Sequence, residues 1–302
     1  MTLRIGTRES LLARWQAEWV AARLRAMNRD VVLVPIRTRG DVNQREAIGT
    51  LDWQGVFTKE LQRALLDAEI DLAVHSLKDL PTEEVAGLQL TAVPERGPVA
   101  DAFVCNRAGS LAELPPGAVV GTGSLRRRAQ LLYHRADLRV EDIRGNVDTR
   151  LRKLDDGQYD AIVLAVAGLT RLGLSKRIAR QLPLTLMLPA VGQGALAIET
   201  RAGHAEAVEA LAALDHPETH AAIAAERAML AALRGGCLAP IAAHGRVQGN
   251  CLVLQGRVVH PHGTRAIEVR HTAAGDEAVA LGRRVAESLL RHGAAELIEA
   301  GR

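Results

Sequence analysis

Aromatic residues are scarce in this sequence, and their scarcity limits what the protein can bind. Only 2% of its 302 residues are Phe, Trp or Tyr. The core must therefore be built from Leu, Val, Ile and Ala, and the aromatic surfaces that stack on single-stranded nucleic acid are nearly excluded. A chain of this length is too long for one small core, so we expect two or three domains.

Cysteine is also rare, and no hydrophobic run is long. Cys105, Cys237 and Cys251 are odd in number, widely spaced and without a CxxC motif, which argues against a disulfide framework or a zinc site. The first residues, MTLRIGTRES, lack the apolar segment of a signal peptide, and no apolar run reaches membrane-spanning length. We therefore expect a cytoplasmic protein with no metal site and no membrane partner.

Lysine is the third scarce residue. Lys and Arg together number 38, yet the only lysines are Lys59, Lys78, Lys153 and Lys176, and the formal net charge is a mild +3. A GC-rich genome that favours arginine codons would explain this, and composition alone favours that explanation. The alternative is that some arginines form carboxylate or phosphate clamps, which the planar guanidinium suits better than an ammonium group. The positions of the arginines have to decide between the two.

Strand-like and helix-like segments alternate over the first two-thirds of the chain, which predicts an α/β fold with mostly parallel sheets. The expected strands are 3–7, 31–38, 71–75, 119–122, 138–143, 161–167 and 194–200, and the expected helices are 11–27, 57–68, 125–135, 147–155, 205–214 and 219–233. Prolines near 94–98 and 183–189 mark breaks, and the strand at 194–200 is expected to return to the first sheet. Paired strands at 251–259 and 266–271, with a closing helix at 277–300, predict a smaller α+β unit.

The segment Gly121–Leu131 (GTGSLRRRAQL) is the most informative local pattern. Ser124 follows a Gly-rich turn and can cap the next helix, which places Arg126 and Arg127 in its first turn. Cations there oppose the helix dipole, whereas a bound anion would relieve the conflict and use the free N–H donors. The competing interpretation is a solvated helix with unremarkable arginines. The dipole conflict makes us prefer anion binding.

A second group of arginines follows another strand. In IRGNVDTRL, Arg144 and Arg150 flank the turn at Gly145-Asn146. With Arg126 and Arg127, four arginines would meet at the carboxyl ends of strands, the edge where open α/β sheets bind ligands.

Polar residues also follow the first and third expected strands. Arg8 lies in GTRES, with Ser10 as a possible helix cap. Ser76, Lys78 and Asp79 lie in VHSLKDLP. A neighbouring Lys and Asp would ordinarily be solvated surface, and their place at a strand end is what favours a site. His75 suits a structural role better than that of a base or a ligand.

Cys237 lies on a glycine-bounded loop, GGCLAP. Helices commonly end at glycine, so helix termination explains Gly235 and Gly236 but not a cysteine behind them. Exposed thiols are uncommon without a role, although a buried, inert cysteine is the usual case. Other motifs fail: there is no P-loop and no GxSxG, and VGQGAL lacks the following helix that a dinucleotide fingerprint requires.

Eleven motifs, taken in order, resemble those of the hydroxymethylbilane synthases, also called porphobilinogen deaminases. They are GTRES, TRGD, FTKEL, VHSLKDLPT, DAFV, SLRRRAQL, RGNVDTRL, YDAIVLAVAGLTRLGL, LPAVGQGALAIE, AERAML and GGCLAPI. The resemblance runs from near Leu3 to the final helix, so it covers nearly the whole chain, and it is highly specific because many independent motifs occur in the right order.

The resemblance implies three domains. These would be a catalytic lobe (1–95 with 190–215), a lobe that binds substrate and cofactor carboxylates (96–189), and an α+β domain that anchors the cofactor (216–302). The two lobes would be similar to those of type II periplasmic binding proteins, each with a central mixed sheet, and the active site would lie in the cleft between them. The family condenses four porphobilinogen molecules head to tail, releases ammonia and frees the linear tetrapyrrole hydroxymethylbilane. A monomeric transferase of porphyrin and haem biosynthesis is therefore expected.

The resemblance also implies roles for single residues. Cys237 would hold the cofactor dipyrromethane through a thioether, and Asp79 would be catalytic. The residues implied to bind the cofactor are Ser76, Lys78, Thr122, Ser124, Arg126, Arg127, Arg144 and Gly145. Those implied to bind substrate are Arg8, Ser10, Arg150, Arg171 and Gln193. Porphobilinogen carries an acetate and a propionate, so bidentate arginines would hold a growing pyrrole chain in register.

The sequence departs from the family pattern at three positions. Gln54 in DWQG stands where the family often has a lysine, so no contact is carried over there, while Lys59 in FTKEL remains. Gly123 replaces a common serine, and Leu238 follows the cysteine where a polar residue is frequent. The loop at 40–54 is hypothesised to act as a lid.

Two other functions compete with this interpretation. A non-catalytic two-lobed binding protein for an anionic ligand would explain the lobes and the arginines, but not Cys237 or the third domain. A nucleic-acid-binding protein is suggested by the pI near 9.0. The mild net charge and the scarce aromatics disfavour it.

Overall fold

The computed structural model describes residues 2–36, 58–234 and 239–301. The chain forms two compact units: Met1–Gly97 with Ala195–His220, and Pro98–Gly194 with Ala221–Arg302. Within the described ranges, no helix combines the length and the apolar character needed to cross a membrane.

The first unit is built on a five-stranded mixed sheet. In spatial order its strands are β2 (Val31–Pro35), β1 (Leu3–Thr7), β3 (Leu72–Ser76), β10 (Leu196–Arg201) and β4 (Leu88–Ala92). β1 is parallel to β2 and β3, whereas β10 is antiparallel to both β3 and β4. The predicted return of the 194–200 segment to the first sheet is therefore confirmed.

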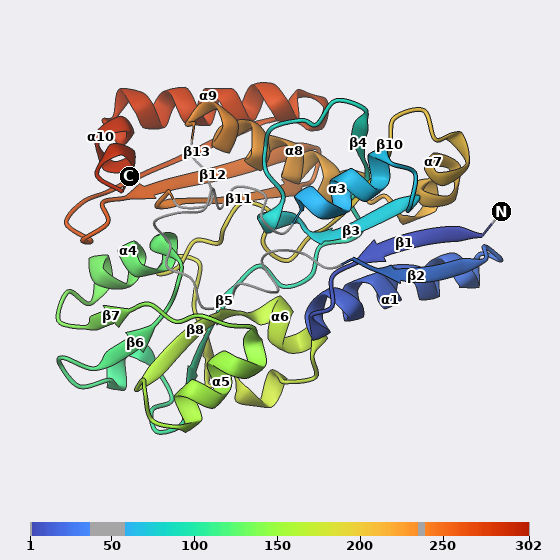
Figure 1. Ribbon diagram of the computed structural model, residues 1–302. Coiled ribbons are helices and arrows are strands. Elements are labelled where there is room, and N and C mark those ends of the chain that lie inside the picture. Colours follow the sequence, from blue (N-terminus) through green and yellow to red (C-terminus); the bar gives the residue numbers. More distant parts are fainter. Residues whose placement is uncertain (1, 37–57, 235–238, 302) are drawn as a thin grey trace. The chain divides into compact units, whose positions relative to one another are not determined.

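Helices cover both faces of this sheet. Side chains of β1, β3 and β10 that point to one face share a core with α1 (Leu11–Ala26) and α7 (Ala205–Leu211). Figure 1 shows α1 lying along β1 and β2. Ala73, which alternates to the other face of β3, packs with α3 (Lys59–Leu66). Because both faces are covered, β3 is fixed in place, and so is the short 3-10 turn η1 (Leu77–Asp79) that follows it.

The second unit contains a sheet with the same pattern of strand directions. In spatial order its strands are β7 (Arg139–Glu141), β6 (Val119–Gly121), β8 (Ala161–Ala165), β5 (Asp101–Cys105) and β9 (Arg180–Gln181). β6 is parallel to β7 and β8, and β5 is antiparallel to β8 and β9. One face packs with α4 (Leu125–His134), and the other packs with α5 (Val147–Asp155) and α6 (Val166–Arg171).

A three-stranded antiparallel sheet completes the second unit. Its strands are β11 (Ile241–Gln248), β12 (Cys251–Val259) and β13 (Ala266–Ala274). They share a core with α8 (Pro217–Ala232), α9 (Ala278–Arg291) and α10 (Ala294–Glu299). In Figure 1, α9 lies along this sheet. The predicted pairing of β12 with β13 is confirmed, with Cys251 opposite Ala274 and Val259 opposite Ala266.

Several elements differ from the sequence predictions. Strands β4, β5, β9 and β11 were not predicted. The expected closing helix at 277–300 is two helices, because Gly293 has φ +92°, a left-handed conformation that interrupts helical geometry. The expected strand at 161–167 ends at Ala165, where α6 begins.

A buried carboxylate joins three segments of the first unit. Asp71, which is fully buried, accepts hydrogen bonds from Arg4 through the backbone N–H and through Nε and Nη2, all at 2.9 Å. Arg201 Nη2 and His204 Nε2 each lie 3.2 Å from its Oδ1. Burial alone would raise the pKa of Asp71, but the hydrogen bonds from Arg4, His204 and Arg201 outweigh it and hold the pKa below its usual range.

This depressed pKa predicts how stability depends on pH. The stabilisation is present above the unfolded-state pKa of about 3.9 and is lost as the pH falls below it. We expect Asp71→Asn to lower the free energy of unfolding by about 3 kcal/mol at neutral pH, because it leaves buried donors without their carboxylate. The difference from the unsubstituted protein should shrink as the pH falls below about 4. Urea unfolding midpoints of the two proteins, measured from neutral pH to below pH 4, check this prediction.

Glu209→Gln is the matched control in the same unit. Glu209 is 75% exposed and pairs with Arg29 at 2.8 Å. Its loss should cost less than about 1 kcal/mol. An equal cost for the two variants, or an Asp71→Asn difference that persists in acid, would contradict the assignment.

Candidate functional site

The end of β3 is held on both faces of the sheet. Ser76 and His75 point to opposite sides, as successive strand residues do. Ser76 Oγ lies 2.8 Å from Gln16 Nε2 and 3.2 Å from Gln16 Oε1, so one of the two amide atoms pairs with the hydroxyl. His75 Nε2 lies 2.9 Å from the Glu199 carboxylate on β10, in agreement with the structural role expected for this histidine. The segment that follows β3 therefore starts from a fixed point.

The turn η1 presents Asp79 at the surface of the first unit. Leu77 is buried, and its N–H donates to the carbonyl of Ala195 at 3.1 Å. Lys78 is half-buried and Asp79 is exposed. Within the described ranges, the Asp79 carboxylate makes no hydrogen bond or ion pair. Asp79 is thus available to a bound molecule, while the backbone that carries it is anchored.

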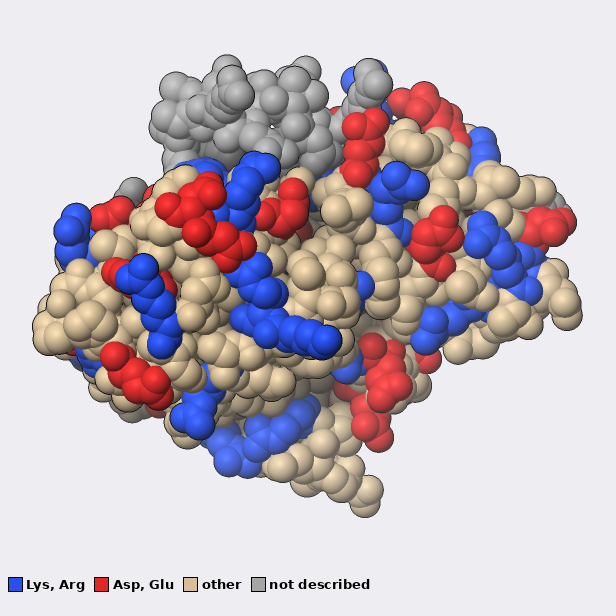
Figure 2. Space-filling model, turned by 90° about the horizontal axis from the view of Figure 1, so that it is seen from below, with Lys and Arg blue, Asp and Glu red and all other residues tan. Residues whose placement is uncertain are grey.

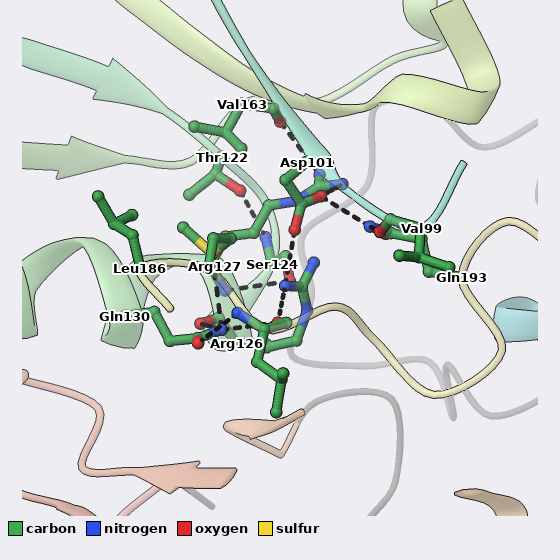
Figure 3. A network of polar contacts seen from close by, with 12 residues as sticks. Val99, Asp101, Thr122, Ser124, Arg126, Arg127, Gln130, Val163, Leu186 and Gln193 are labelled. Carbon is green, nitrogen blue, oxygen red and sulfur yellow. Dashed lines mark hydrogen bonds and ion pairs between the residues drawn. The ribbon is translucent and has the colours of Figure 1, made fainter. Parts of the chain in front are cut away.

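A second group of polar residues surrounds Asp101 in the second unit (Figure 3). Asp101 is fully buried at the start of β5. Its carboxylate accepts from Arg126 Nη1 at 2.8 Å, and from Arg127 Nε at 2.9 Å and Nη2 at 2.7 Å. Gln193 Nε2 donates to it at 3.0 Å and to the carbonyl of Val99 at 2.8 Å. One carboxylate on β5 thus organises side chains from two other segments of the chain.

The local sequence explains why both arginines reach Asp101. Ser124 caps α4, because its Oγ accepts from the N–H of Arg127 at 3.5 Å, as predicted. Thr122 Oγ1 accepts from the N–H of Ser124 at 3.2 Å and shapes the turn before the helix. Arg126 and Arg127 therefore lie in the first turn, where Asp101 supplies a negative charge that the helix dipole favours.

The electrostatic balance of this cluster favours an additional anion. Arg126 and Arg127 share one carboxylate, and their other hydrogen bonds go to the carbonyls of Leu188 at 2.7 Å and Val163 at 3.0 Å. Burial lowers the pKa of Arg126, the Asp101 charge opposes that shift, and the Arg127 charge adds to it. Arg126 Nε is buried without a hydrogen-bond partner in the described part of the chain. A carboxylate bound here would supply both charge and an acceptor.

Two further predicted arginines, Arg144 and Arg150, lie after β7, outside the Asp101 cluster. Arg144 Nη2 donates to Asp142 at 2.9 Å, and Arg150 Nε donates to the carbonyl of Gly145 at 2.8 Å. Gly145 has φ +108°, and a Cβ there would lie 2.6 Å from Thr149 Cγ2, so only glycine fits. Because β6 and β7 are parallel neighbours, the segments that carry Arg126 and Arg144 leave the sheet at the same edge.

Arg171 lies in the last turn of α6 and is partly buried. Its Nη2 donates to the carbonyl of Gly194 at 2.6 Å. Burial lowers the pKa of Arg171 to about 10, so the side chain remains a cation at neutral pH.

Other predicted residues lie at element ends or outside the described ranges. Arg8 directly follows β1, and Ser10 caps α1 by accepting from the N–H of Ala13 at 3.3 Å. Cys237, Gln54, Leu238 and the loop at 40–54 lie outside the described residues. In the described part of the chain, no group of three or more His, Cys, Asp or Glu side chains could hold a metal ion.

Sequence reasoning missed two residues of the Asp101 cluster. Asp101 was noted only as part of DAFV, although a single acid at the start of an apolar strand was an available signal. Gln130, one helical turn after Arg126, is buried and donates to the carbonyl of Leu188 at 3.0 Å. Nothing in the local pattern indicated that role, because its partners lie far along the chain.

These features define an α/β protein with two mixed five-stranded sheets and a buried arginine cluster suited to a carboxylate ligand. The family model described as "Porphobilinogen deaminase, dipyromethane cofactor binding domain" matches residues 3–209, and "Porphobilinogen deaminase, C-terminal domain" matches residues 220–291. The chain belongs to the porphobilinogen deaminase family, a family of transferases in tetrapyrrole biosynthesis. The family resemblance drawn from the motifs is therefore confirmed.

Relatives match the chain over nearly its full length. The porphobilinogen deaminase of Desulforudis audaxviator is 50% identical over 296 residues, which cover 97% of this chain and 96% of that protein. That of Xanthomonas euvesicatoria is 51% identical over 299 residues, or 98% of each chain. Among solved structures, the methionine-binding protein MetQ has 16% identity and a TM-score of 0.46, over 70% of this chain and 89% of that one.

The central place of Asp101 is testable by substitution. Asp101→Asn would leave two buried guanidinium groups without a carboxylate, so we expect it to lower the free energy of unfolding by about 3–5 kcal/mol. Asp142→Asn removes a carboxylate that is 55% exposed beside Arg144, and should cost less than about 1 kcal/mol. Urea unfolding of the two variants in parallel measures the contrast. Equal midpoints would show that Asp101 is not needed to hold the arginines.

Proposed function

We propose that the protein is a hydroxymethylbilane synthase. It would condense four porphobilinogen molecules head to tail onto a covalently bound dipyrromethane, and release ammonia and the linear tetrapyrrole. The observation that carries the proposal is the buried Arg126–Arg127 pair, which shares one carboxylate inside the segment matched by the cofactor-binding family model. Two cations with one internal anion suit a ligand made of acetate and propionate groups.

The donors of the second unit fit dipyrromethane. Arg126 Nε has no hydrogen-bond partner among the described residues, and it is suited to a carboxylate, as are the guanidinium forks nearby. We propose that the cofactor is held by Ser76, Lys78, Thr122, Ser124, Arg126, Arg127, Arg144 and Gly145, and is anchored through a thioether at Cys237. When bound, dipyrromethane supplies a primer that keeps the growing chain attached to the protein.

Substrate carboxylates would be held by a second set of residues. This set comprises Arg8, Ser10, Arg150, Arg171 and Gln193. Ser10 caps α1 and Gln193 contacts Asp101, so these two side chains would act chiefly by holding the segments on which they lie. The three arginines would bind incoming porphobilinogen directly.

Asp79 is proposed to act on the reacting substrate. Loss of ammonia leaves positive charge on the substrate, and a carboxylate beside it stabilises that charge more strongly at a site shielded from water. As the carboxylate, the same group can take a proton from a pyrrole nitrogen, and as the carboxylic acid it can give one to the departing amine. Its lack of an internal partner within the described ranges supports this role.

Substitution of Asp79 separates catalysis from binding. Asp79→Asn keeps size and shape but removes the charge, so we expect turnover to be nearly abolished while the protein folds and retains its cofactor. Glu84→Gln, an exposed acid on the segment after η1, should leave turnover unchanged. Ammonia release from porphobilinogen measures both variants, and near-normal turnover in Asp79→Asn would rule out the role.

The anchor is tested by intact mass. The purified protein should be heavier than its sequence by two pyrrole units, and Cys237→Ser should lose that increment. Cys251→Ser is the control, because Cys251 is a free and exposed thiol. An unchanged mass in the Cys237→Ser variant would refute the anchor at this residue.

The other parts of the proposal concern organisation and partners. We propose three domains (1–95 with 190–215, 96–189 and 216–302), supported near residue 216 by the two family models, which end at 209 and begin at 220. We also propose a cytoplasmic monomer that acts on porphobilinogen. On the face in Figure 2, basic and acidic side chains are interspersed, which gives no support there to nucleic-acid binding. Release of ammonia would distinguish the enzyme from a non-catalytic binding protein.

A further inference from the structure

A connecting segment of the second unit contacts the arginine cluster. This segment, residues 185–194, is called the connector here. The carbonyl of Leu188 accepts from Arg126 Nη1 at 2.7 Å, and Gln193 donates to Asp101 at 3.0 Å. The connector therefore supplies two of the polar contacts that hold Arg126 and its carboxylate.

The same connector is held by residues of the C-terminal sheet and its helix. Arg257 on β12 donates through Nη2 to the carbonyl of Thr185 at 2.9 Å. The N–H of Ala243 on β11 donates to the carbonyl of Pro189 at 3.0 Å. Glu226 on α8 accepts from the N–H of Gly192 at 2.7 Å. Three elements thus fix the connector at three points along its length.

Gln130 joins these two sets of contacts. Its Oε1 accepts from Arg257 Nη1 at 2.8 Å and from the N–H of Leu188 at 2.9 Å. Its Nε2 donates to the carbonyl of Leu188 at 3.0 Å and approaches the carbonyl of Arg126 at 3.4 Å. Figure 3 shows Gln130 beside Arg126 at the start of α4. Gln130 is 1% exposed and Arg257 is 7% exposed, so both are shielded from competing water.

We propose that Arg257 is a positioning residue for the arginine cluster. It acts through Gln130 and Leu188 to fix Arg126, with Glu268 on β13 orienting its guanidinium. The inference rests on the proposed function, because it assigns a catalytic consequence to a residue outside the cofactor-binding set. The domain that carries Cys237 thereby also sets the place of an arginine that holds the cofactor carboxylates.

The positioning role of Arg257 requires the planar, forked geometry of its guanidinium group. Arg257 offers separate nitrogens to Gln130, Thr185 and Glu268, which a single ammonium cannot contact together. Loss of this fork would let Leu188 and Arg126 shift, and a shift of about 1 Å in a positioning group can lower turnover by about a hundredfold. Because Arg126 is assigned to the cofactor and not to incoming porphobilinogen, kcat should fall more than KM rises.

The test compares Arg257→Gln with Arg270→Gln in the cofactor-loaded protein. For Arg257→Gln we expect kcat per loaded molecule to fall by about tenfold or more, and apoprotein incubated with porphobilinogen to acquire the cofactor mass more slowly. Arg270 is exposed on β13, and its substitution should leave kcat within about twofold. A purely structural role would lower the unfolding temperature of Arg257→Gln and leave kcat per loaded molecule unchanged well below that temperature, which would overturn the proposal.

Two further variants keep the proposal testable. If Arg257→Gln does not fold, Arg257→Lys keeps the buried charge without the fork, and we expect kcat to fall by about threefold or more. The double variant Gln130→Leu/Arg257→Gln should lose less kcat, in free-energy terms, than the two single losses added together. The reason is that both residues act on Arg126 through the same contacts. If the two losses of kcat are additive, Arg257 does not act through Gln130, and the proposal is overturned. If the unsubstituted protein releases no ammonia from porphobilinogen, the proposed function itself fails; normal kcat and loading in both Arg257 variants overturn only this inference.

Discussion

The candidate cofactor site depends on the ion pairs that the Asp101 carboxylate makes with Arg126 and Arg127. Two guanidinium groups lie side by side in a buried position, where their mutual repulsion and their loss of hydration would each be costly. A single carboxylate at the start of β5 offsets part of that cost and leaves one positive charge in excess. The cluster is therefore held by an internal carboxylate and keeps guanidinium groups that suit the acid groups of the proposed cofactor.

The two candidate sites are constructed differently. Around Asp101, charged side chains are locked by hydrogen bonds from α4, β5 and the connector. At the end of β3, the backbone is locked while Asp79 itself has no internal partner in the described ranges. Binding a fixed cofactor requires preset donors, whereas a carboxylate that meets a succession of substrates requires access. The difference in construction matches the difference in proposed roles.

Local sequence patterns predicted the features that depend on neighbours in sequence. The caps at Ser10 and Ser124 and the length of α5 follow from residue types within one or two helical turns. The partner of Arg126 was not predictable in this way, because Asp101 lies 25 residues away and Leu188 lies 62 residues away. The short strands β4 and β9 were missed because their pairing depends on long-range neighbours. The break between α9 and α10 at Gly293 could have been predicted from the sequence, since a glycine inside a helical pattern often marks the end of a helix.

The order of strands in the first sheet has a consequence for how the chain folds during synthesis. β4 joins the sheet only by pairing with β10, and more than 100 residues separate Ala92 from Leu196, among them all five strands of the second sheet. Until β10 emerges from the ribosome, β3 is left with an unpaired edge, and such an edge can pair with another chain. Contacts of this sequence separation form slowly. All strands of the second sheet are thus synthesised before the first sheet can be completed, although domains are usually finished in the order of synthesis.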